Sequence, residues 1–520
     1  MKFILGLLFF TCVYSGFTQK DSASVYGNTI LAADLKKHLE IIASDEYEGR
    51  ETGRKGQKMA AKYIVNHFKS IGVPGGNKGE YYQQFPLIIQ YTGGTDITVN
   101  DKKYDFLEDF YFYRGFSDTT FTSDEIVFVG YGIDDKRYSD YKKIDVNGKI
   151  VMILAGEPFK KGKSIITRSK NVSPWSTNWR LKKQVAKDKG ASAILIVSEN
   201  IQQDISNTIH YIESPSMILN TGKPTSSKQL TNFYVSTNFA NEILKETGES
   251  IESLRNKITK KTITLSCKTK VNIEMDREKE KLSSENVLGF IEGTDKKEEI
   301  IILTAHYDHI GVDLKNNEVY NGADDDGSGT VAILEIAEAF AKAKKDGNGP
   351  RRSVLIMPVA GEEKGLLGSE YYSDNPIYPL ANTVVDLNID MIGRLDKKHA
   401  GNPNYVYIIG STMLSKELHE VNEAANFNYT KLDLDYEFNT TDDPNRYYYR
   451  SDHYNFAKNG VPVIFYFNGV HEDYHKPTDT VDKINFMKME TITRLVFYTA
   501  WQLANQEKRI ELDGALQKSN

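Results

Sequence analysis

Two segments rich in aspartate and histidine lie close together in the middle of the chain. His306 and Asp308 follow an apolar run, and residues 324–326 are three consecutive aspartates ahead of Gly327-Ser328-Gly329. Adjacent carboxylates repel one another in an apolar environment unless cations compensate their charge. Metal ions are the obvious compensation. The stretch from Thr304 to Gly329 therefore predicts metal-ion chemistry.

Further candidate ligands follow three other apolar runs. Glu362 and Glu363 come after SVLIMPVA, Asp390 closes TVVDLNI, and His475 follows VPVIFYF after a short polar segment. Sites in parallel sheets form at the carboxyl ends of the strands. One such residue alone more often shapes a turn or makes a hydrogen bond than binds a metal. Four strand ends that offer His, Asp or Glu, together with the triple aspartate, favour a metal site.

The elements that must position these residues alternate between apolar runs and amphipathic segments after Asn286. We expect strands over residues 287–291, 300–305, 353–359, 383–389 and 463–467, and helices over 330–345, 414–426 and 487–504. The alternation predicts an α/β fold, a mostly parallel sheet with helices on both faces. Helices at 31–43 and 56–71 are expected to join this domain. Residues 44–53, between them, have the composition of a solvated loop.

The middle of the chain differs in character. Short strand-like runs such as 126–130 and 193–197, with a helix at 181–189, predict an inserted β-rich α+β domain. We place the insertion at residues 121–282 and the two parts of the other domain at 28–120 and 283–510. The charged run at the end of the insertion, MDREKEK, is interpreted as a solvated linker.

Composition excludes several classes of protein. A chain of 520 residues is too long for one ordinary core, so two or more domains are expected. The 40% hydrophobic and 26% charged content is typical of a soluble globular protein. The net charge of −6 and the dispersed basic residues argue against a nucleic-acid partner. After the N-terminus no apolar run approaches the ~20 residues of a transmembrane helix.

The first residues have the pattern of a secretory signal peptide, which we place at residues 1–19. Lys2 precedes an apolar run from Phe3 to Tyr14, and small residues follow. We therefore expect export to the periplasm or the exterior. Cys12 raises the alternative of lipidation, which the bulky residues before it suit poorly. After cleavage only Cys267 would remain, so no intramolecular disulfide is expected.

Six motifs together resemble the co-catalytic di-zinc aminopeptidase family, which includes bacterial leucyl aminopeptidases and glutamate carboxypeptidase-like enzymes. In chain order they are TAHYDHIG, NGADDDGSGT, GEEKGLLGS, LNIDMIGR, RSDHYNF and YHKPTDT. The resemblance covers the N-terminal helices and everything after Asn286, and it implies the zinc-peptidase phosphorylase/hydrolase-like fold. The middle region is similar to the protease-associated insertion of many members, through EIVFVGYGID, NGKIVMILAGEP and GASAILIV.

Residue by residue, the resemblance implies a set of ligands for two zinc ions per chain. Asp325 would bridge the metals, His306 and Asp390 would complete one site, and Glu363 and His475 the other. The three carboxylates would carry three negative charges against four positive charges. Asp324 and Asp326 would instead shape the turn and its hydrogen bonds.

The resemblance also implies roles for residues that do not bind metal. Glu362 would act as the general base on a metal-bridging water, and Asp308 would orient His306. Tyr448 and His453 are candidates for contacting the substrate or the oxyanion. His309, His471 and His453 are expected to be structural or close to the substrate rather than ligands.

The implied activity is that of an exported zinc-dependent exopeptidase that removes N-terminal residues from peptides. A dipeptidase or a glutamate-type carboxypeptidase is the alternative. Two more distant alternatives are a glutaminyl cyclase, which uses a similar ligand set with one zinc, and a non-catalytic binding module. Metal stoichiometry separates the former, and the complete ligand set disfavours the latter. Side-chain preference, native metal and oligomeric state stay open at this point.

Overall fold

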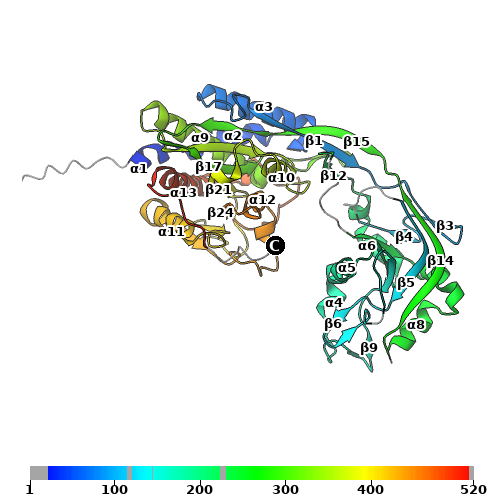
Figure 1. The fold of residues 1–520 in the computed structure, drawn as a ribbon. Helices are drawn as coiled ribbons and strands as arrows, with labels where there is room; N and C mark the ends of the chain where they lie inside the picture. Colours follow the sequence, from blue (N-terminus) through cyan, green and yellow to red (C-terminus); the bar gives the residue numbers. More distant parts are fainter. Residues whose placement is uncertain (1–21, 114–119, 143, 223–229, 260, 514–520) are drawn as a thin grey trace, which may run out of the picture. The chain divides into compact units, whose positions relative to one another are not determined.

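The computed structural model in Figure 1 describes residues 22–113, 120–142, 144–222, 230–259 and 261–513. The predicted signal peptide, residues 1–19, and Cys12 lie outside the described residues. Among those that are described, no helix has the length and apolar content needed to cross a membrane. The chain divides into two compact units. The first comprises the residues up to Phe85 and from Ser283 onward, and the second runs from Pro86 to Leu282.

A seven-stranded sheet forms the centre of the described part of the first unit. Its strands, in spatial order, are β16 (Gly289–Ile291), β20 (Arg352–Val359), β17 (Lys296–His306), β21 (Thr383–Ile389), β24 (Val463–Phe467), β22 (Tyr405–Ile409) and β23 (Asp433–Asp435). The four strands from β20 to β24 run parallel to one another, whereas β16 and β22 each run antiparallel to a neighbour. The predicted α/β fold with a mostly parallel sheet is confirmed.

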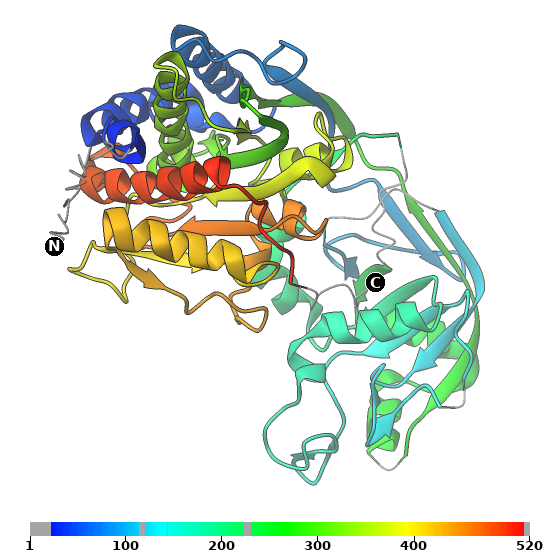
Figure 2. The same cartoon turned by 60° about the vertical axis from the view of Figure 1, so that its left-hand side comes forward.

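Helices cover both faces of this sheet because its strands are apolar on both sides. Ile300 and Ile302 of β17 share a core cluster with Tyr372 of α10 (Leu367–Asp374) and Phe456 of α12 (His453–Ala457). The residues between and after them are equally buried and point to the opposite face. There, α9 (Gly329–Lys345) and α13 (Phe486–Asn505) contact the same strand, as can be followed in Figures 1 and 2.

Three helices near the start of the described residues belong to the first unit, and the sequence predicted the second and third of them. They are α1 (Ser22–Gly27), α2 (Ala32–Ile42) and α3 (Lys55–Ser70). All three contact α9, and α2 also contacts α13, so they lie beside the green and red helices in Figure 2. On α3 the buried stripe includes Ala60, Ile64 and Phe68 at helical spacing. The remaining long helix, α11 (Lys416–Ala425), packs against α13.

The second unit holds an eight-stranded mixed sheet among its described residues. The strands, in spatial order, are β3 (Lys102–Tyr104), β2 (Thr95–Val99), β14 (Thr264–Met275), β5 (Thr120–Val129), β8 (Ile150–Leu154), β11 (Ala193–Val197), β13 (Thr231–Val235) and β4 (Phe110–Tyr111). Its helices are α4 (Pro174–Thr177), α5 (Trp179–Asp188), α6 (Ile201–Glu213), α7 (Thr237–Leu244) and α8 (Ile251–Ile258).

This unit begins earlier than the boundary predicted at residue 121. Strand β2 pairs with β14, with Ile97 opposite Ile273, and both side chains are fully buried. Strands β2, β3 and β4, which lie in a segment that the sequence assigned to the other domain, therefore complete the sheet of the second unit. The pairing joins segments far apart in the chain, so no local pattern indicates it.

The charged run before the second domain boundary is not a solvated linker. Met275 ends β14, Arg277 is buried, and β15 (Lys279–Val287) begins two residues later. A strand with one solvated face can carry charged residues at alternate positions, which explains why composition was misleading here. Strand β1 (Tyr82–Gln90) pairs with β12 (Ser216–Leu219). The short hairpins are β6–β7 (Asp134–Asp135, Tyr138–Ser139), β9–β10 (Phe159–Lys160, Lys163–Ser164) and β18–β19 (Gly311–Asp313, Glu318–Tyr320).

Candidate metal centre

The strand ends of the first unit bring the predicted ligands to one place. His306 is the last residue of β17, Asp390 follows β21, and Glu363 lies just beyond β20. His475 stands in the loop after β24. Asp325 lies in η3 (Ala323–Ser328), an irregular turn that leads into α9. The carboxyl ends of parallel strands share one edge of the sheet, and this is why the five side chains meet.

One cluster consists of His306, Asp325 and Asp390. The Nε2 atom of His306 lies 3.2 Å from Oδ1 of Asp325 and 3.6 Å from Oδ1 of Asp390. Ligand atoms around a tetrahedral zinc ion, ~2.0–2.1 Å from the metal, are about 3.3 Å apart. The three side chains therefore have the spacing of a zinc site. Ser451 holds Asp390 in place by donating a 2.7 Å hydrogen bond to its other carboxylate oxygen.

A second cluster uses the other oxygen of Asp325. Nε2 of His475 lies 3.1 Å from Oδ2 of Asp325 and 3.3 Å from Oε2 of Glu363. His309 joins this cluster, with its Nδ1 atom 2.8 Å from Oε1 of Glu363 and 3.9 Å from Oδ2 of Asp325. From the sequence, His309 was expected to be structural or close to the substrate rather than a ligand. Its position three residues after His306, on the same strand-end segment, is the sequence feature that could have placed it in this cluster.

The donor atoms of both clusters fit metal ions. Within the part of the chain that the structure describes, five buried atoms of these residues have no hydrogen-bond partner: His306 Nε2, both ring nitrogens of His309, Asp325 Oδ2 and Glu363 Oε1. Imidazole nitrogen and carboxylate oxygen are the ligands that zinc prefers outside cysteine sites. Buried carboxylates in this number also require compensating positive charge. Both the chemistry of the donors and their unsatisfied state are those of a metal centre.

Close contact between carboxylates and imidazoles dominates the electrostatics. Burial alone would raise the pKa of Glu363, but its interactions with His309 and His475 lower the pKa to about 2. Burial would lower the pKa of His475, and the carboxylates of Asp325 and Glu363 raise it to about 10. The carboxylates thus hold protons on the imidazoles. A zinc ion bound there would displace these protons, so metal binding is coupled to proton release.

Glu362 lies beside the first cluster. Its Oε2 atom is 3.8 Å from Nε2 of His306, and its backbone N–H donates to Oδ1 of Asp308 at 3.3 Å. Burial raises the pKa of Glu362 well above its ordinary value, and Glu363 and Asp390 act in the same direction. A carboxylate with a raised pKa next to metal ligands is suited to accept and return a proton.

Asp308 contacts both His306 and the segment of Glu362. Nδ1 of His306 makes a 3.0 Å hydrogen bond with the main-chain carbonyl of Asp308, whereas the Asp308 carboxylate is 3.8 Å away. That carboxylate accepts a hydrogen bond from Thr52 Oγ1 at 2.6 Å and the one from the N–H of Glu362. Asp308 therefore contacts His306, as the resemblance implied, through its main chain rather than its side chain. The backbone orients the imidazole, and the side chain holds the segment of Glu362.

The two flanking aspartates hold the turn that carries Asp325. Asp324 accepts hydrogen bonds from the N–H of Gly393 and from Asn468 Nδ2, at 2.6 and 3.2 Å. Asp326 accepts from three backbone N–H groups, those of His306, Gly329 and Met391. His471 lies 3.2 Å from Asp324 rather than at either cluster.

Two residues of the supporting network were missed from the sequence. The Asp479 carboxylate accepts hydrogen bonds from the N–H groups of Asp324 and Asp325. Arg50 is fully buried, although its segment was interpreted as a solvated loop. It ends η1 (Asp45–Arg50) and donates to four main-chain carbonyls, including those of Tyr307 and Gly322 on either side of the centre. Composition cannot distinguish such a buried arginine from a solvated one.

A cavity opens at the two clusters. Asp325, Glu362 and Asp390 line its polar side. The rest of its wall is largely apolar and aromatic: Met391, Tyr447, Arg450, Phe465, Phe467, Val470 and Tyr474. The chemistry of the centre is therefore accessible next to a surface that suits an apolar side chain.

The structure places neither Tyr448 nor His453 at this cavity. Both are buried in the hydrophobic core, where His453 stacks on Phe465 with ring centroids 4.8 Å apart. Tyr448 lies in η6 (Tyr447–Tyr449), a helical turn that sends consecutive side chains in different directions. Tyr447 is the tyrosine of this run that reaches the cavity. The prediction that Tyr448 and His453 contact the substrate is not supported by this geometry.

Residues 286–500 match the model described as peptidase family M28. The chain carries a peptidase family M28 domain. The match spans the sheet, α9 and every cluster residue named above. The predicted family is thus confirmed for this part of the chain.

Curated relatives with similar sequences carry peptidase names. A probable leucine aminopeptidase of Arthroderma otae is 31% identical over 215 residues, 40% of this chain and 55% of that protein. A probable zinc metalloprotease of Leptosphaeria maculans is 33% identical over 109 residues, 21% of this chain and 24% of that protein. The chain thus spans about half or less of the curated relatives that it matches.

A solved structure resembles the chain over nearly its full length. It is an aminopeptidase from Aneurinibacillus sp. strain AM-1, with a TM-score of 0.51 and 19% sequence identity. The superposition covers 94% of this chain and 97% of that one. At this identity the likeness supports the fold.

Proposed function

We propose that the chain is an exported zinc-dependent exopeptidase, an aminopeptidase that hydrolyses N-terminal residues from peptides. One observation carries the proposal: two clusters of metal-binding side chains share Asp325 and lie beside Glu362 at a common cavity in the M28 domain. The names of similar proteins, leucine aminopeptidase and zinc metalloprotease, support the same activity.

Each cluster would hold one zinc ion. His306 and Asp390 would bind the first, Glu363 and His475 the second, and Asp325 would bind both. His309 adds a fourth protein donor to the second site through its contact with Glu363. Three carboxylates against two divalent cations leave one positive charge. This charge attracts electron-rich groups such as a substrate carbonyl oxygen.

Glu362 would transfer the proton in the reaction. Bound zinc would supply a Lewis acid for the scissile carbonyl and lower the pKa of water. Glu362 takes a proton from the attacking water and returns it to the nitrogen of the leaving amine. Its raised pKa is suited to holding that proton between the two steps. Asp308 keeps the carboxylate in position through the N–H of Glu362.

The cavity wall indicates the substrate class. Met391, Phe465, Phe467 and Val470 would contact an apolar side chain next to the scissile bond. Arg450 supports a second candidate function, because a guanidinium at the cavity can pair with a substrate C-terminal carboxylate. A dipeptidase or carboxypeptidase would use that contact. The names of similar proteins favour the aminopeptidase.

The remaining parts of the chain receive proposed roles from their sequence patterns. The second unit, Pro86–Leu282, would be the protease-associated-like insertion, on the strength of the motifs quoted above. Residues 1–19 would direct export. A peptide substrate is the one partner that this function requires.

A substrate panel tests the proposal. The full chain is assayed on leucyl peptides with a free amine, with a blocked N-terminus and with an amidated C-terminus, and its zinc content is measured on the same sample. We expect cleavage of free-amine and amidated peptides, no cleavage of blocked ones, and zinc bound at the centre. Equal cleavage of blocked and free peptides would sink the aminopeptidase assignment, and failure on amidated ones would favour the carboxypeptidase.

The variant Glu362→Gln tests the role of the base. The amide keeps the shape of the side chain but cannot accept the proton, so we expect at least a hundredfold loss of turnover. Zinc content should match the unmodified protein, since Glu362 is not assigned to a metal. Turnover near the unmodified level would show that another group accepts the proton.

A further inference from the structure

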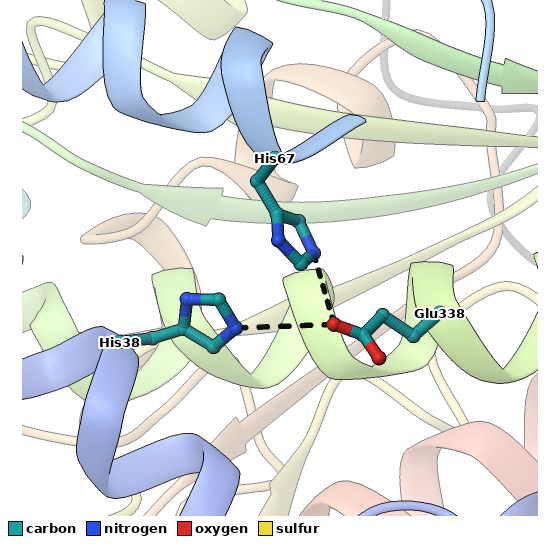
Figure 3. Close-up of side chains that lie close together, drawn as sticks. All are labelled: His38, His67 and Glu338. Atoms are coloured by element: carbon teal, nitrogen blue, oxygen red, sulfur yellow. Dashed lines mark ion pairs between the residues drawn. The ribbon is translucent and has the colours of Figure 1, made fainter. Parts of the chain in front are cut away.

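A second group of histidines and glutamates lies in the first unit, away from the centre around Asp325. His38 is on α2, His67 on α3, and Glu335 and Glu338 lie one turn apart on α9 (Figure 3). The catalytic proposal uses none of these residues. His67 and His38 stand edge to face, with ring centroids 4.6 Å apart. Figure 3 shows both imidazoles directed at the Glu338 carboxylate.

The distances between the donor atoms suit one metal ion. Nε2 of His67 lies 3.4 Å from Oε1 of Glu338, and Nε2 of His38 lies 4.0 Å from the same oxygen. Nε2 of His38 is also 3.5 Å from Oε1 of Glu335. A tetrahedral zinc site has ligand atoms about 3.3 Å apart. The ligand atoms of His38, His67 and Glu338 all lie within 4.8 Å of one another, and Glu335 adjoins this group through its contact with His38.

The outer nitrogen of each imidazole is already occupied. Nδ1 of His38 is 2.6 Å from the Tyr63 hydroxyl. A backbone hydrogen bond with Leu334 holds the His67 ring, and it must use Nδ1 because Nε2 has no partner among the described residues. Metal-binding histidines characteristically hold one ring nitrogen in such a bond and present the other to the metal. Both rings present Nε2 to the glutamates.

Hydrogen bonds among the four side chains do not account for how their atoms face one another. If Nδ1 of His67 donates to the Leu334 carbonyl, a neutral ring presents the bare lone pair of Nε2 to the Glu338 oxygen. Two acceptors then face each other. Oε1 of Glu335, on a side chain 2% exposed, likewise has no hydrogen-bond partner within the described ranges, although Nε2 of His38 lies 3.5 Å away. A cation between these atoms satisfies them all.

We propose that His38, His67, Glu335 and Glu338 form a separate binding site for a divalent zinc-type cation. Four protein donors leave no position for a substrate, so this is a structural site. It joins α2 and α3 to α9, and α9 begins directly after the turn that carries Asp325. A bound ion would stabilise the packing of the N-terminal helices on α9 without entering the reaction.

Metal counting on the full chain tests this site. The protein is stripped with a chelator and titrated with zinc against a competing indicator, and the same is done for His67→Gln and Glu338→Ala. Glu338 is 42% exposed on a helix surface, so alanine there should preserve the fold even if His67→Gln does not. Glu420→Ala, another exposed glutamate on a helix, is the matched control.

We expect the unmodified protein and Glu420→Ala to bind one zinc equivalent more than Glu338→Ala and His67→Gln. Anomalous diffraction at the zinc edge should give a peak between the two Nε2 atoms and the Glu338 carboxylate. Zinc should also raise the melting temperature of the unmodified chain more than that of Glu338→Ala. Equal zinc stoichiometry in all four proteins, or no peak at saturating zinc, would overturn the proposal and leave a hydrogen-bonded cluster.

These results do not depend on the peptidase assignment. Peptidase activity per chain is measured on the same samples, and Glu338→Ala is expected to keep it. A chain without peptidase activity that still loses one zinc equivalent in Glu338→Ala would refute the proposed function and support this site. The reverse result would refute only this site.

Discussion

Replacing Arg50 is the sharpest test of how the metal centre is supported. Its guanidinium donates hydrogen bonds of 2.7–2.9 Å to the main-chain carbonyls of Ile42, Tyr307, Asn321 and Gly322. Hydrogen bonds from a charged donor contribute about 1.5–3 kcal/mol each, so the four contribute roughly 6–12 kcal/mol. Burial lowers the pKa of Arg50 from 12.5 to about 10, a cost of about 3 kcal/mol. The net stabilisation is then roughly 3–9 kcal/mol.

The variant Arg50→Met keeps the aliphatic volume and removes all four donors. Urea unfolding of the full chain should show a loss within that range, together with weaker zinc binding. Arg50→Lys should fall between, since one ammonium cannot reach all four carbonyls. Arg137→Met, which removes a single hydrogen bond to Ile166 at the surface of the second unit, is the control and should cost no more than about 1.5 kcal/mol. An Arg50→Met variant within about 1 kcal/mol of the unmodified protein would refute the reasoning.

Two further predictions concern Lys488 and Asp308. Burial lowers the pKa of Lys488 from 10.5 to about 7, so its proton is bound less tightly in the folded state, and stability is lost as the pH falls from 10.5 towards 7. Lys488→Met removes a destabilisation of about 5 kcal/mol at pH 6 and loses one hydrogen bond to the Tyr405 carbonyl. The melting temperature of this variant should therefore exceed that of the unmodified chain at pH 6 but not at pH 10. The opposite order would contradict the burial argument. Asp308→Ala removes the acceptor for the N–H of Glu362 and for the Thr52 hydroxyl, so we expect at least a tenfold lower kcat. Zinc content should stay unchanged, because the main chain at residue 308 still holds His306. Loss of zinc would contradict this prediction.

The fold was predictable wherever one strand or helix carried a complete local pattern. The apolar runs 383–389 and 463–467 became β21 and β24 with the same bounds. Both are buried on two faces, and such strands need no alternation to be recognised. Strand β22 (Tyr405–Ile409) was missed, although it is equally buried. Its residues include two tyrosines, and tyrosine is common in loops and strands alike.

The convergence of the candidate ligands was predictable because a parallel sheet collects its strand ends at one edge. His306, Asp390 and Glu363 needed only the strand assignment and the motif. Side-chain direction was not predictable in the same way. Tyr447 and Tyr448 are adjacent and chemically identical, and only the rotation of one helical turn decides that the first reaches the cavity. The direction of the His309 side chain was not predictable from the sequence either.

The supporting residues were the least predictable, because their partners are backbone groups with no identity in the sequence. Arg50 binds four carbonyls, and Asp479 binds the N–H groups of Asp324 and Asp325. A charged residue in a loop is usually solvated, so composition favours the wrong environment for both. Each such residue is recognisable only once the chain is folded around it.

The turn that carries Asp325 depends on residues from distant parts of the chain. The turn that holds Asp325 is fixed from one side by Arg50, near the start of the chain, and from the other by Asp479, near its end. Both supports hold the turn that carries Asp325, the residue that the two clusters share. Zinc binding at the proposed centre would therefore be coupled to folding of the first unit. An ion bound by His38, His67 and Glu338 would also stabilise the folded state of the first unit. It would link α2 and α3, the helices on either side of Arg50, to α9. Chelation at both places should destabilise the first unit more than the loss of either ion alone.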